Sequence, residues 1–218
     1  GFSNSEASAE GPIIKSAQDR VLENNITLDD VLNLAKKIRE FNQDVGIILM
    51  GYISNLYMYS IEKFVKKLKV YDLDGCLVVD APHELKEENI LREELNKSDL
   101  ALIKLIAPTT TGKRREEIAK LAKGFIYGVN VKGITGVKTV NSDSVLKMYK
   151  DIKKLTKIPV CSGFGIKTPS DAKEVASTGV EGVVVGSTFV DYIEKNLNDT
   201  NLSKNLGKKI KEFTNKLN

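Results

Sequence analysis

The sequence has no tryptophan, one histidine and two cysteines among its 218 residues. His83 has no partner at metal-ligand spacing, which argues against a metal site. Cys76 and Cys161 both lie within apolar, strand-like runs, where we expect buried, reduced thiols rather than a disulfide or a nucleophile. No run approaches the roughly 20 apolar residues that span a bilayer, so the sequence predicts no membrane segment.

The sequence also lacks a strong charge of one sign. Its net charge of +4 comes from 33 basic and 29 acidic residues, which interleave on solvated stretches such as 113–117 and the tail near 208–211. Without a stripe of basic and aromatic residues, nucleic acid is not an expected partner. Residues 1–5 lack the basic and then apolar regions of a secretory signal, so we expect a cytoplasmic protein.

Short apolar runs alternate with helical patterns along the chain. The runs are continuous rather than alternating, which is typical of a parallel sheet buried on both faces. A capping-box pattern at Thr27, with Asp30 in place of the usual glutamate, and a Thr168-Pro169 pair each mark a helix start. The expected strands are 45–50, 76–79, 100–106, 125–131, 159–161 and 182–185, and the expected helices are 12–22, 31–41, 62–69, 86–95, 116–123, 145–155 and 170–176.

Three glycine-bearing turns follow the last expected strands. They are 133–136, 163–165 and 186–187, and another helix opens directly after the third at Thr188. Backbone N–H groups approach a phosphate closely only where no Cβ intervenes, and a helix N-terminus adds the favourable end of its dipole. One such turn is a weak signal, but three in series predict a phosphate site made by Gly136, Gly165, Gly186 and Ser187.

Six β/α units suggest an α/β fold of the TIM (β/α)8 barrel type, which needs eight strands and typically about 250 residues. The chain opens in a Ser/Ala/Glu/Gly-containing loop, 1–11, and then a helix, as though two strands preceded it. We therefore expect residues 1–218 to form a single barrel domain that is incomplete at its N-terminus. On this interpretation we expect strands three to eight to be represented and the first two to be absent from this chain.

The order of the motifs resembles that of the tryptophan synthase α subunit over nearly the whole chain. Single motifs recur in other phosphate-binding barrels, but the ordered set is specific. The matching segments are 1–14, Met50-Gly51-Tyr52 with Asn55, Val79-Asp80-Ala81-Pro82, 106–110, 133–136, 163–166 and 185–187.

The resemblance implies retro-aldol cleavage of indole-3-glycerol phosphate to indole and glyceraldehyde 3-phosphate, without metal or organic cofactor. Indole would then pass to a β subunit that carries pyridoxal phosphate. Glu10 takes the place of the family aspartate that faces the indole nitrogen, in a loop two residues longer. The family's second catalytic carboxylate, a glutamate ending strand two, has no counterpart in this chain. For Glu10 alone, a solvated loop residue near a helix N-terminus is the alternative.

The resemblance assigns further residues by position. Thr135 would contact the catalytic carboxylate when its loop closes. Asn4 and Asp80 would face or signal to the β subunit, although loop capping is an equal alternative for Asp80. Aromatic side chains would supply a wall for indole, with core packing as the alternative for the tyrosines. These side chains are Phe2, Tyr52, Tyr127 and Phe164.

Two other functions stay open. Glu10, Asn4 and Ser5 depart from the family pattern, which fits a non-catalytic α-like subunit that binds and activates the β subunit. The chain is also compatible with another barrel enzyme that acts on a different sugar phosphate, if the apolar wall for indole were absent.

Overall fold

The computed structural model describes residues 1–4, 10–129, 142–163 and 165–217. The chain divides into two compact units, Gly1–Ile103 and Lys104–Asn218, and each is described by itself. Strand β3 (Ala101–Ile106) belongs to both, since Ala101 to Ile103 pair with the preceding strand and Lys104 to Ile106 with the following one. All the strand pairs described are parallel, which confirms the expected α/β class.

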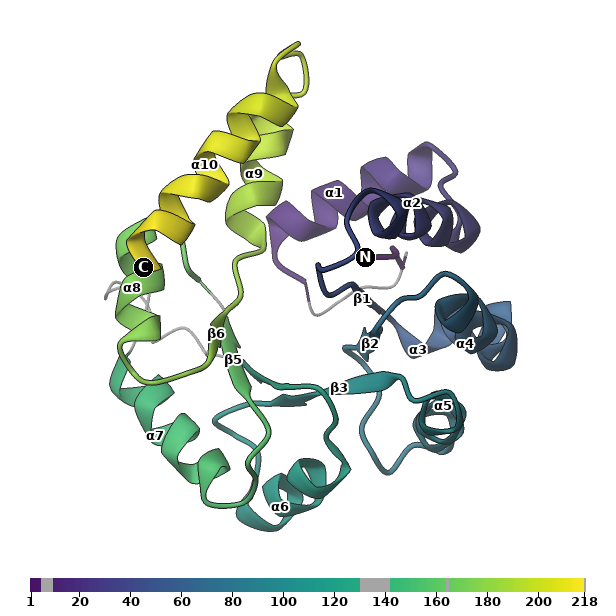
Figure 1. Ribbon diagram of the computed structural model, residues 1–218, viewed down its shortest axis with the longest axis vertical. Coiled ribbons are helices and arrows are strands. Elements are labelled where there is room, and N and C mark those ends of the chain that lie inside the picture. Colours follow the sequence, from purple (N-terminus) through teal and green to yellow (C-terminus); the bar gives the residue numbers. More distant parts are fainter. Residues whose placement is uncertain (5–9, 130–141, 164, 218) are drawn as a thin grey trace. The chain divides into compact units, whose positions relative to one another are not determined.

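The first unit places β1 and β2 side by side, with Leu49 opposite Cys76, and pairs β2 with the start of β3. Helices α3, α4 and α5 pack against one another (Figure 1). Every residue of β2 is buried, as expected for a strand covered on both faces. The elements of this unit are α1 (Pro12–Glu23), α2 (Leu28–Phe41), β1 (Ile48–Gly51), α3 (Ile53–Tyr59), α4 (Ile61–Val70), β2 (Gly75–Val78) and α5 (Lys86–Lys97).

The second unit orders its strands β3, β4, β5 and β6, all parallel. Helix α10 packs against α8 and lies alongside α9 (Figure 1), where the rings of Phe189 and Phe213 meet edge to face at 5.2 Å. Its elements after β3 are α6 (Gly112–Leu121), β4 (Ile126–Val129), α7 (Ser142–Lys153), β5 (Val160–Gly163), α8 (Pro169–Ala176), β6 (Gly182–Val183), α9 (Ser187–Lys195) and α10 (Leu202–Leu217).

Both predicted helix starts are confirmed. The Thr27 hydroxyl accepts a hydrogen bond from the Asp30 N–H, and the Asp30 carboxylate accepts one from the Thr27 N–H, so aspartate completes the capping box. The same reciprocal pair forms between Thr168 and Asp171 at α8.

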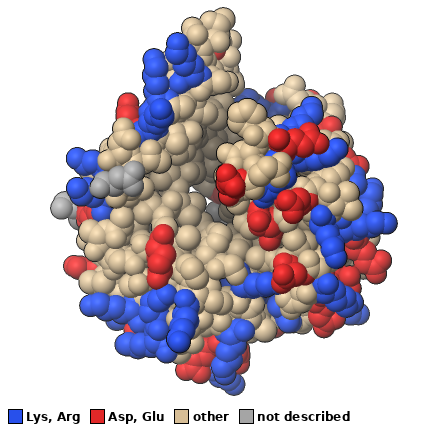
Figure 2. Space-filling view, viewed as in Figure 1, with Lys and Arg blue, Asp and Glu red and all other residues tan. Residues whose placement is uncertain are grey.

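On the surface, basic and acidic side chains interleave over much of the face in Figure 2, while basic ones gather along α10 at the upper left. None of the described helices has the length and apolar content needed to cross a bilayer.

Several element boundaries differ from the sequence prediction. The first strand begins at Ile48 rather than at residue 45, and Val45 is exposed in the preceding turn. Helix α6 runs from Gly112 to Leu121 and not over the predicted range 116–123. The sequence pattern missed its first turn because that turn is polar and shows no apolar period. Cys76 is fully buried as expected, but the prediction for Cys161 was wrong in part because its side chain is only half-buried. Burial nevertheless raises the pKa of the Cys161 thiol.

A buried arginine joins α2 to the turns before β1 and β2. Arg39 is 6% exposed, and it donates to the Asp72 carbonyl at 2.7 Å, the Gln43 carbonyl at 2.7 Å and the Asp74 carboxylate at 2.8 Å. Asp74 also accepts the Ile47 N–H. These bonds fix the segment that leads into β1.

Arg39→Met should lower the free energy of unfolding by about 2 kcal/mol, because it removes a buried guanidinium that donates hydrogen bonds to two backbone carbonyls and one carboxylate. Urea unfolding followed by circular dichroism measures the loss. Lys36→Met is the matched control, since the Lys36–Glu40 ion pair is exposed and should be worth about 0.5 kcal/mol. Equal losses in the two variants would contradict this role of Arg39.

Candidate functional site

Glu10, Tyr52 and Gln18 form a hydrogen-bonded network in the first unit. Tyr52 directly follows β1 and is the N-cap residue of α3, whereas Glu10 lies just before α1 and Gln18 within it. The Tyr52 hydroxyl donates to Oε1 of Glu10 at 2.7 Å, and the Gln18 amide donates to the Tyr52 oxygen at 3.1 Å. The sequence analysis assigned Glu10 and Tyr52 to the same site without predicting this contact, and it missed Gln18.

Tyr52 is buried, with 6% of its surface exposed. Burial, with smaller contributions from the Glu10 and Asp80 carboxylates, raises the pKa of the Tyr52 phenol to about 12, against the opposing effect of the Gln18 hydrogen bond. The phenol therefore stays protonated throughout the neutral range and acts as a hydrogen-bond donor to Glu10.

Asp80 follows the carboxyl end of β2, and its carboxylate accepts the Ile53 N–H at 2.8 Å. Ile53 is the first residue of α3, so Asp80 caps a helix from the neighbouring strand. This contact fixes the backbone next to Tyr52. This helix cap differs from the capping of its own loop that was the predicted alternative for Asp80, and a signalling role stays a prediction.

The N-terminal segment is tied to the end of β1. The Phe2 N–H donates to the Met50 carbonyl at 3.0 Å, and the Phe2 ring, 5% exposed, meets Phe64 edge to face at 6.2 Å. Asn4 donates to the Ser54 hydroxyl at 2.9 Å. Phe2 thus lies in the core of the first unit, and its contribution to an indole wall stays a prediction.

The second unit contains the predicted glycines that the structure describes. Gly165 has φ +71°, a left-handed conformation that favours glycine, and Gly186 is the N-cap of α9, which begins at Ser187. The Thr188 hydroxyl donates to the Ile166 carbonyl at 2.5 Å, so the turn after β5 and the start of α9 lie together. The first N–H groups of a helix have no partner within it, and they suit an anion.

Tyr127 lies half-buried on β4. A Cβ at Gly163 would come within 3.0 Å of the Tyr127 hydroxyl and 2.5 Å of the Val184 carbonyl, so the first glycine of the 163–165 turn permits this close packing. Thr135, Gly136 and Phe164 lie outside the described residues. Their assigned roles stay predictions.

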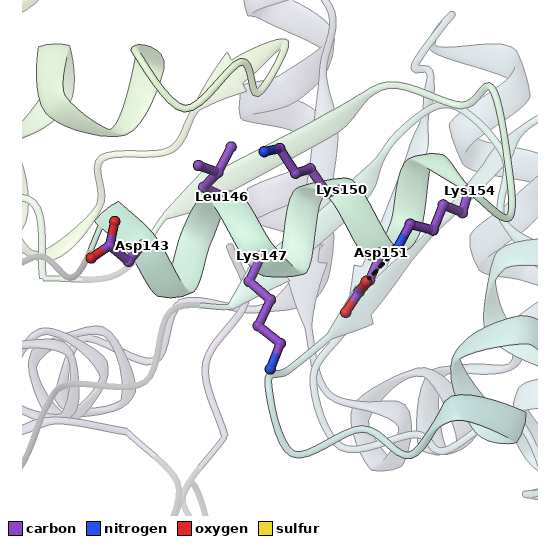
Figure 3. Close-up of a pocket in the computed structure, with 6 residues that line it drawn as sticks. All are labelled: Asp143, Leu146, Lys147, Lys150, Asp151 and Lys154. Atoms are coloured by element: carbon purple, nitrogen blue, oxygen red, sulfur yellow. Dashed lines mark hydrogen bonds and ion pairs between the residues drawn. The ribbon is translucent and has the colours of Figure 1, made fainter.

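Two further features carry no predicted residue. In the part of the chain that the structure describes, no cluster of three or more His, Cys, Asp or Glu side chains has the arrangement of a metal site. A depression of about 290 Å³ runs along α7, with the Lys154–Asp151 ion pair at 3.2 Å at one end (Figure 3). Its lining follows a helical spacing opposite the buried residues Val145, Met148 and Ile152, so it is the outer face of a surface helix.

Gln18 was the main residue that the sequence reasoning overlooked. Its signal is weak, because one amide in an amphipathic helix looks like a solvated side chain. Ile14 and Gln18 are one helical turn apart, on the same face of α1. That spacing could have marked Gln18 as a polar residue on an inward edge.

In each unit, parallel strands alternate with helices and polar or glycine residues follow the carboxyl ends of strands, an arrangement typical of the class of β/α barrel proteins. The sequence model of the family described as "Tryptophan synthase alpha chain" matches residues 1–218. The chain is 37% identical over 194 residues to the tryptophan synthase alpha chain of Methylibium petroleiphilum, covering 89% of this chain and 70% of that relative. This chain therefore belongs to the tryptophan synthase alpha chain family.

Solved structures agree with this assignment. The chain is similar to tryptophan synthase subunit alpha from Legionella pneumophila, with a TM-score of 0.87, 29% identity and coverage of 100% of this chain and 79% of that one. It is also similar to a chain of the tryptophan synthase complex from Pyrococcus furiosus, with a TM-score of 0.85, 25% identity and coverage of 98% and 83%. The resemblance found in the motifs is confirmed, and with it the α-subunit function in tryptophan biosynthesis.

Proposed function

We propose that this chain is a carbon–carbon lyase that cleaves indole-3-glycerol phosphate into indole and glyceraldehyde 3-phosphate. The observation that carries the proposal is the 2.7 Å hydrogen bond from the buried Tyr52 hydroxyl to the Glu10 carboxylate. This hydrogen bond holds the Glu10 carboxylate in one orientation beside Tyr52, the residue that directly follows β1. A carboxylate held in this way can stabilise positive charge that develops at the indole N–H.

The cleavage also needs an acid that protonates the indole ring carbon and a base that accepts the glycerol hydroxyl proton. We assign Glu10 to the indole nitrogen only. The expectation that the family's second carboxylate lies outside these 218 residues stays a prediction, and no described carboxylate is assigned to its role. The proposed chemistry uses no metal or organic cofactor in this subunit.

We propose that the substrate phosphate binds the second unit at Gly165, Gly186 and Ser187. The start of α9 offers backbone N–H groups and the positive end of a helix dipole, and no atom of the described residues lies within 4 Å of the place where a Cβ of residue 186 would be. Gly136 and Thr135 are expected to contribute from the preceding turn. Binding energy from the phosphate would position the reacting carbon atoms, so phosphate binding would raise kcat as well as affinity.

We further propose that the strands of the chain correspond to strands three to eight of a TIM barrel, and that residues 1–218 act as one domain in the cytoplasm. Strand β3, which pairs in both units, supports a single domain. The Methylibium petroleiphilum relative extends beyond the matched residues, since the alignment covers 70% of its length.

The proposed partner is a tryptophan synthase β subunit carrying pyridoxal phosphate, which would receive the indole. The solved Pyrococcus furiosus structure is of a tryptophan synthase complex, which supports an association of this kind. Asn4 and Asp80 are the residues that we assign to the interface or to signalling. Asn4 is held by Ser54 beside α3, and Asp80 caps α3, so both contact the same short segment.

Product analysis tests the reaction. The natural full-length protein, incubated with indole-3-glycerol phosphate, should release indole and glyceraldehyde 3-phosphate in equal amounts, and a β subunit should accelerate the release. Separation by liquid chromatography with mass detection measures both products. Absence of indole in both conditions would contradict the lyase and leave a non-catalytic, β-activating subunit. A different aldehyde product would point to another sugar-phosphate substrate.

A further inference from the structure

Gln18 links the N-terminal segment to Tyr52 through both ends of its side-chain amide. Its Oε1 accepts the backbone N–H of Asn4 at 3.2 Å, and its Nε2 donates to the Tyr52 hydroxyl oxygen at 3.1 Å. Rotating the amide by half a turn would bring its NH2 group against the Asn4 N–H, donor against donor. The two contacts therefore fix which end of the amide faces Tyr52.

This orientation determines where the Tyr52 proton points. A phenol has a single proton, and an oxygen that already accepts from Gln18 can use that proton for another partner. Oε1 of Glu10 lies 2.7 Å away and accepts it. The hydrogen bonds consequently run in one direction, from the Asn4 backbone to Gln18, then to Tyr52, and end at Glu10.

We propose that Gln18 is a positioning residue for the carboxylate of Glu10, acting through the direction of the Tyr52 hydroxyl. Gln18 itself does not touch the substrate. The inference deepens the proposed lyase function and rests on it, because it assigns Oε1 of Glu10 to Tyr52 and the other carboxylate oxygen, Oε2, to the indole nitrogen.

The network can influence the reaction because a small displacement of a catalytic group lowers the reaction rate. A displacement of about 1 Å can lower a rate by about 100-fold. Tyr52 is buried, so it has few alternative partners from water. Without the Gln18 donor, the phenol oxygen loses the contact that keeps its O–H directed at Glu10. The carboxylate then loses its fixed orientation.

The test uses Gln18→Leu, Tyr52→Phe and the double variant, each in the full-length protein. Gln18→Leu should lower kcat for indole release about tenfold, with KM changed less than about twofold, as expected for the loss of one hydrogen bond that acts on the transition state. The double variant should lose no more than Tyr52→Phe alone, because Gln18 has no effect without the phenol. Multiplying losses in the double variant would overturn the proposal and assign Gln18 a merely structural role.

Two companion variants sharpen the result. Gln18→Glu keeps an acceptor for Asn4 but offers Tyr52 a second carboxylate in place of a donor. It should therefore lower kcat at least as much as Gln18→Leu. Asp19→Leu changes the neighbouring, exposed position of α1 and should leave kcat unchanged. An activity of Gln18→Glu equal to that of the unaltered protein would contradict the proposal.

A measurement without turnover separates this proposal from the lyase itself. In protein labelled with 13C at the tyrosine ζ carbon, the Tyr52 resonance is identified by its loss in Tyr52→Phe. Gln18→Leu should shift that resonance and Asp19→Leu should not. If the unaltered protein releases no indole but the resonance shifts, the proposed function fails while the Gln18–Tyr52 contact stands. If the resonance does not move, the positioning role is refuted whatever the activity.

Discussion

Glu10→Gln should lower kcat for indole release about 1000-fold. Removing the negative charge takes away the group that stabilises the indole N–H as positive charge develops, and such groups contribute about 100- to 10,000-fold. The amide keeps an oxygen that can accept the Tyr52 hydroxyl, so the hydrogen bond now seen at 2.7 Å has a replacement. Steady-state assays of indole release over a range of substrate concentrations measure the effect.

Glu23→Gln is the matched control for this experiment. It makes the same change of charge and volume at the exposed C-terminal end of α1 and should leave kcat within about twofold. Thermal unfolding of both variants should match that of the unaltered protein. A Glu10→Gln variant that retains a third or more of the activity would show that Glu10 is a solvated loop residue and not a catalytic one.

Gly186→Asp should raise KM for indole-3-glycerol phosphate about 100-fold. The new carboxylate would lie at the N-cap of α9, and two like charges a few ångströms apart near a protein surface repel by a few kcal/mol. Among the residues that the structure describes there is room for the side chain, since none has an atom within 4 Å of a Cβ placed at Gly186. A negative charge at a helix N-terminus is itself favourable by about 0.5 kcal/mol, so stability and substrate binding should change in opposite directions.

The neutral isostere isolates the effect of charge at this position. Gly186→Asn has nearly the same size and should raise KM less than about fivefold, because it adds no negative charge. Initial-rate kinetics and thermal unfolding of the two variants provide the comparison. Equal KM values for the aspartate and asparagine variants would mean that the phosphate does not bind at the start of α9.

Much of the fold could be predicted because its signals are local. The run at β2 is continuous and apolar, and the helix starts at Thr27 and Thr168 carry polar residues that cap helices by themselves. The predicted strand 45–50 begins too early, because apolar character alone does not distinguish an exposed residue before the strand, such as Val45, from a strand residue. Hydrogen-bond pairing, which ends the strand, depends on the partner strand and is invisible in one sequence.

The elements next to the site were harder to predict. Helix α3 has seven residues and is followed by Ser60, whose φ of +81° separates it from α4. So short a helix has no clear period, and a serine in this conformation gives no glycine-like signal. The position of Glu10 followed from a motif, but its contact with Tyr52 joins residues 42 positions apart. Gln18 was missed for the same reason, since its partners are set by tertiary structure.

Phe2 illustrates the limit of assigning roles from aromatic residues alone. In the sequence, an aromatic residue near a predicted site looks the same whether its ring contacts a ligand or packs in the core. In the structure, Gly51 admits the ring, because a Cβ there would lie 2.0 Å from a Phe2 carbon atom. The ring therefore anchors the N-terminal segment on β1, which a sequence pattern of single residues does not encode.

The most direct test measures indole release and β-subunit activation in the same samples of the natural full-length protein and its Glu10→Gln variant. We expect the natural protein to release indole from indole-3-glycerol phosphate and to activate a β subunit. The variant should still activate the β subunit while its own release of indole falls about 1000-fold. Equal activation by both proteins with no indole released by either would contradict the lyase and establish a non-catalytic subunit.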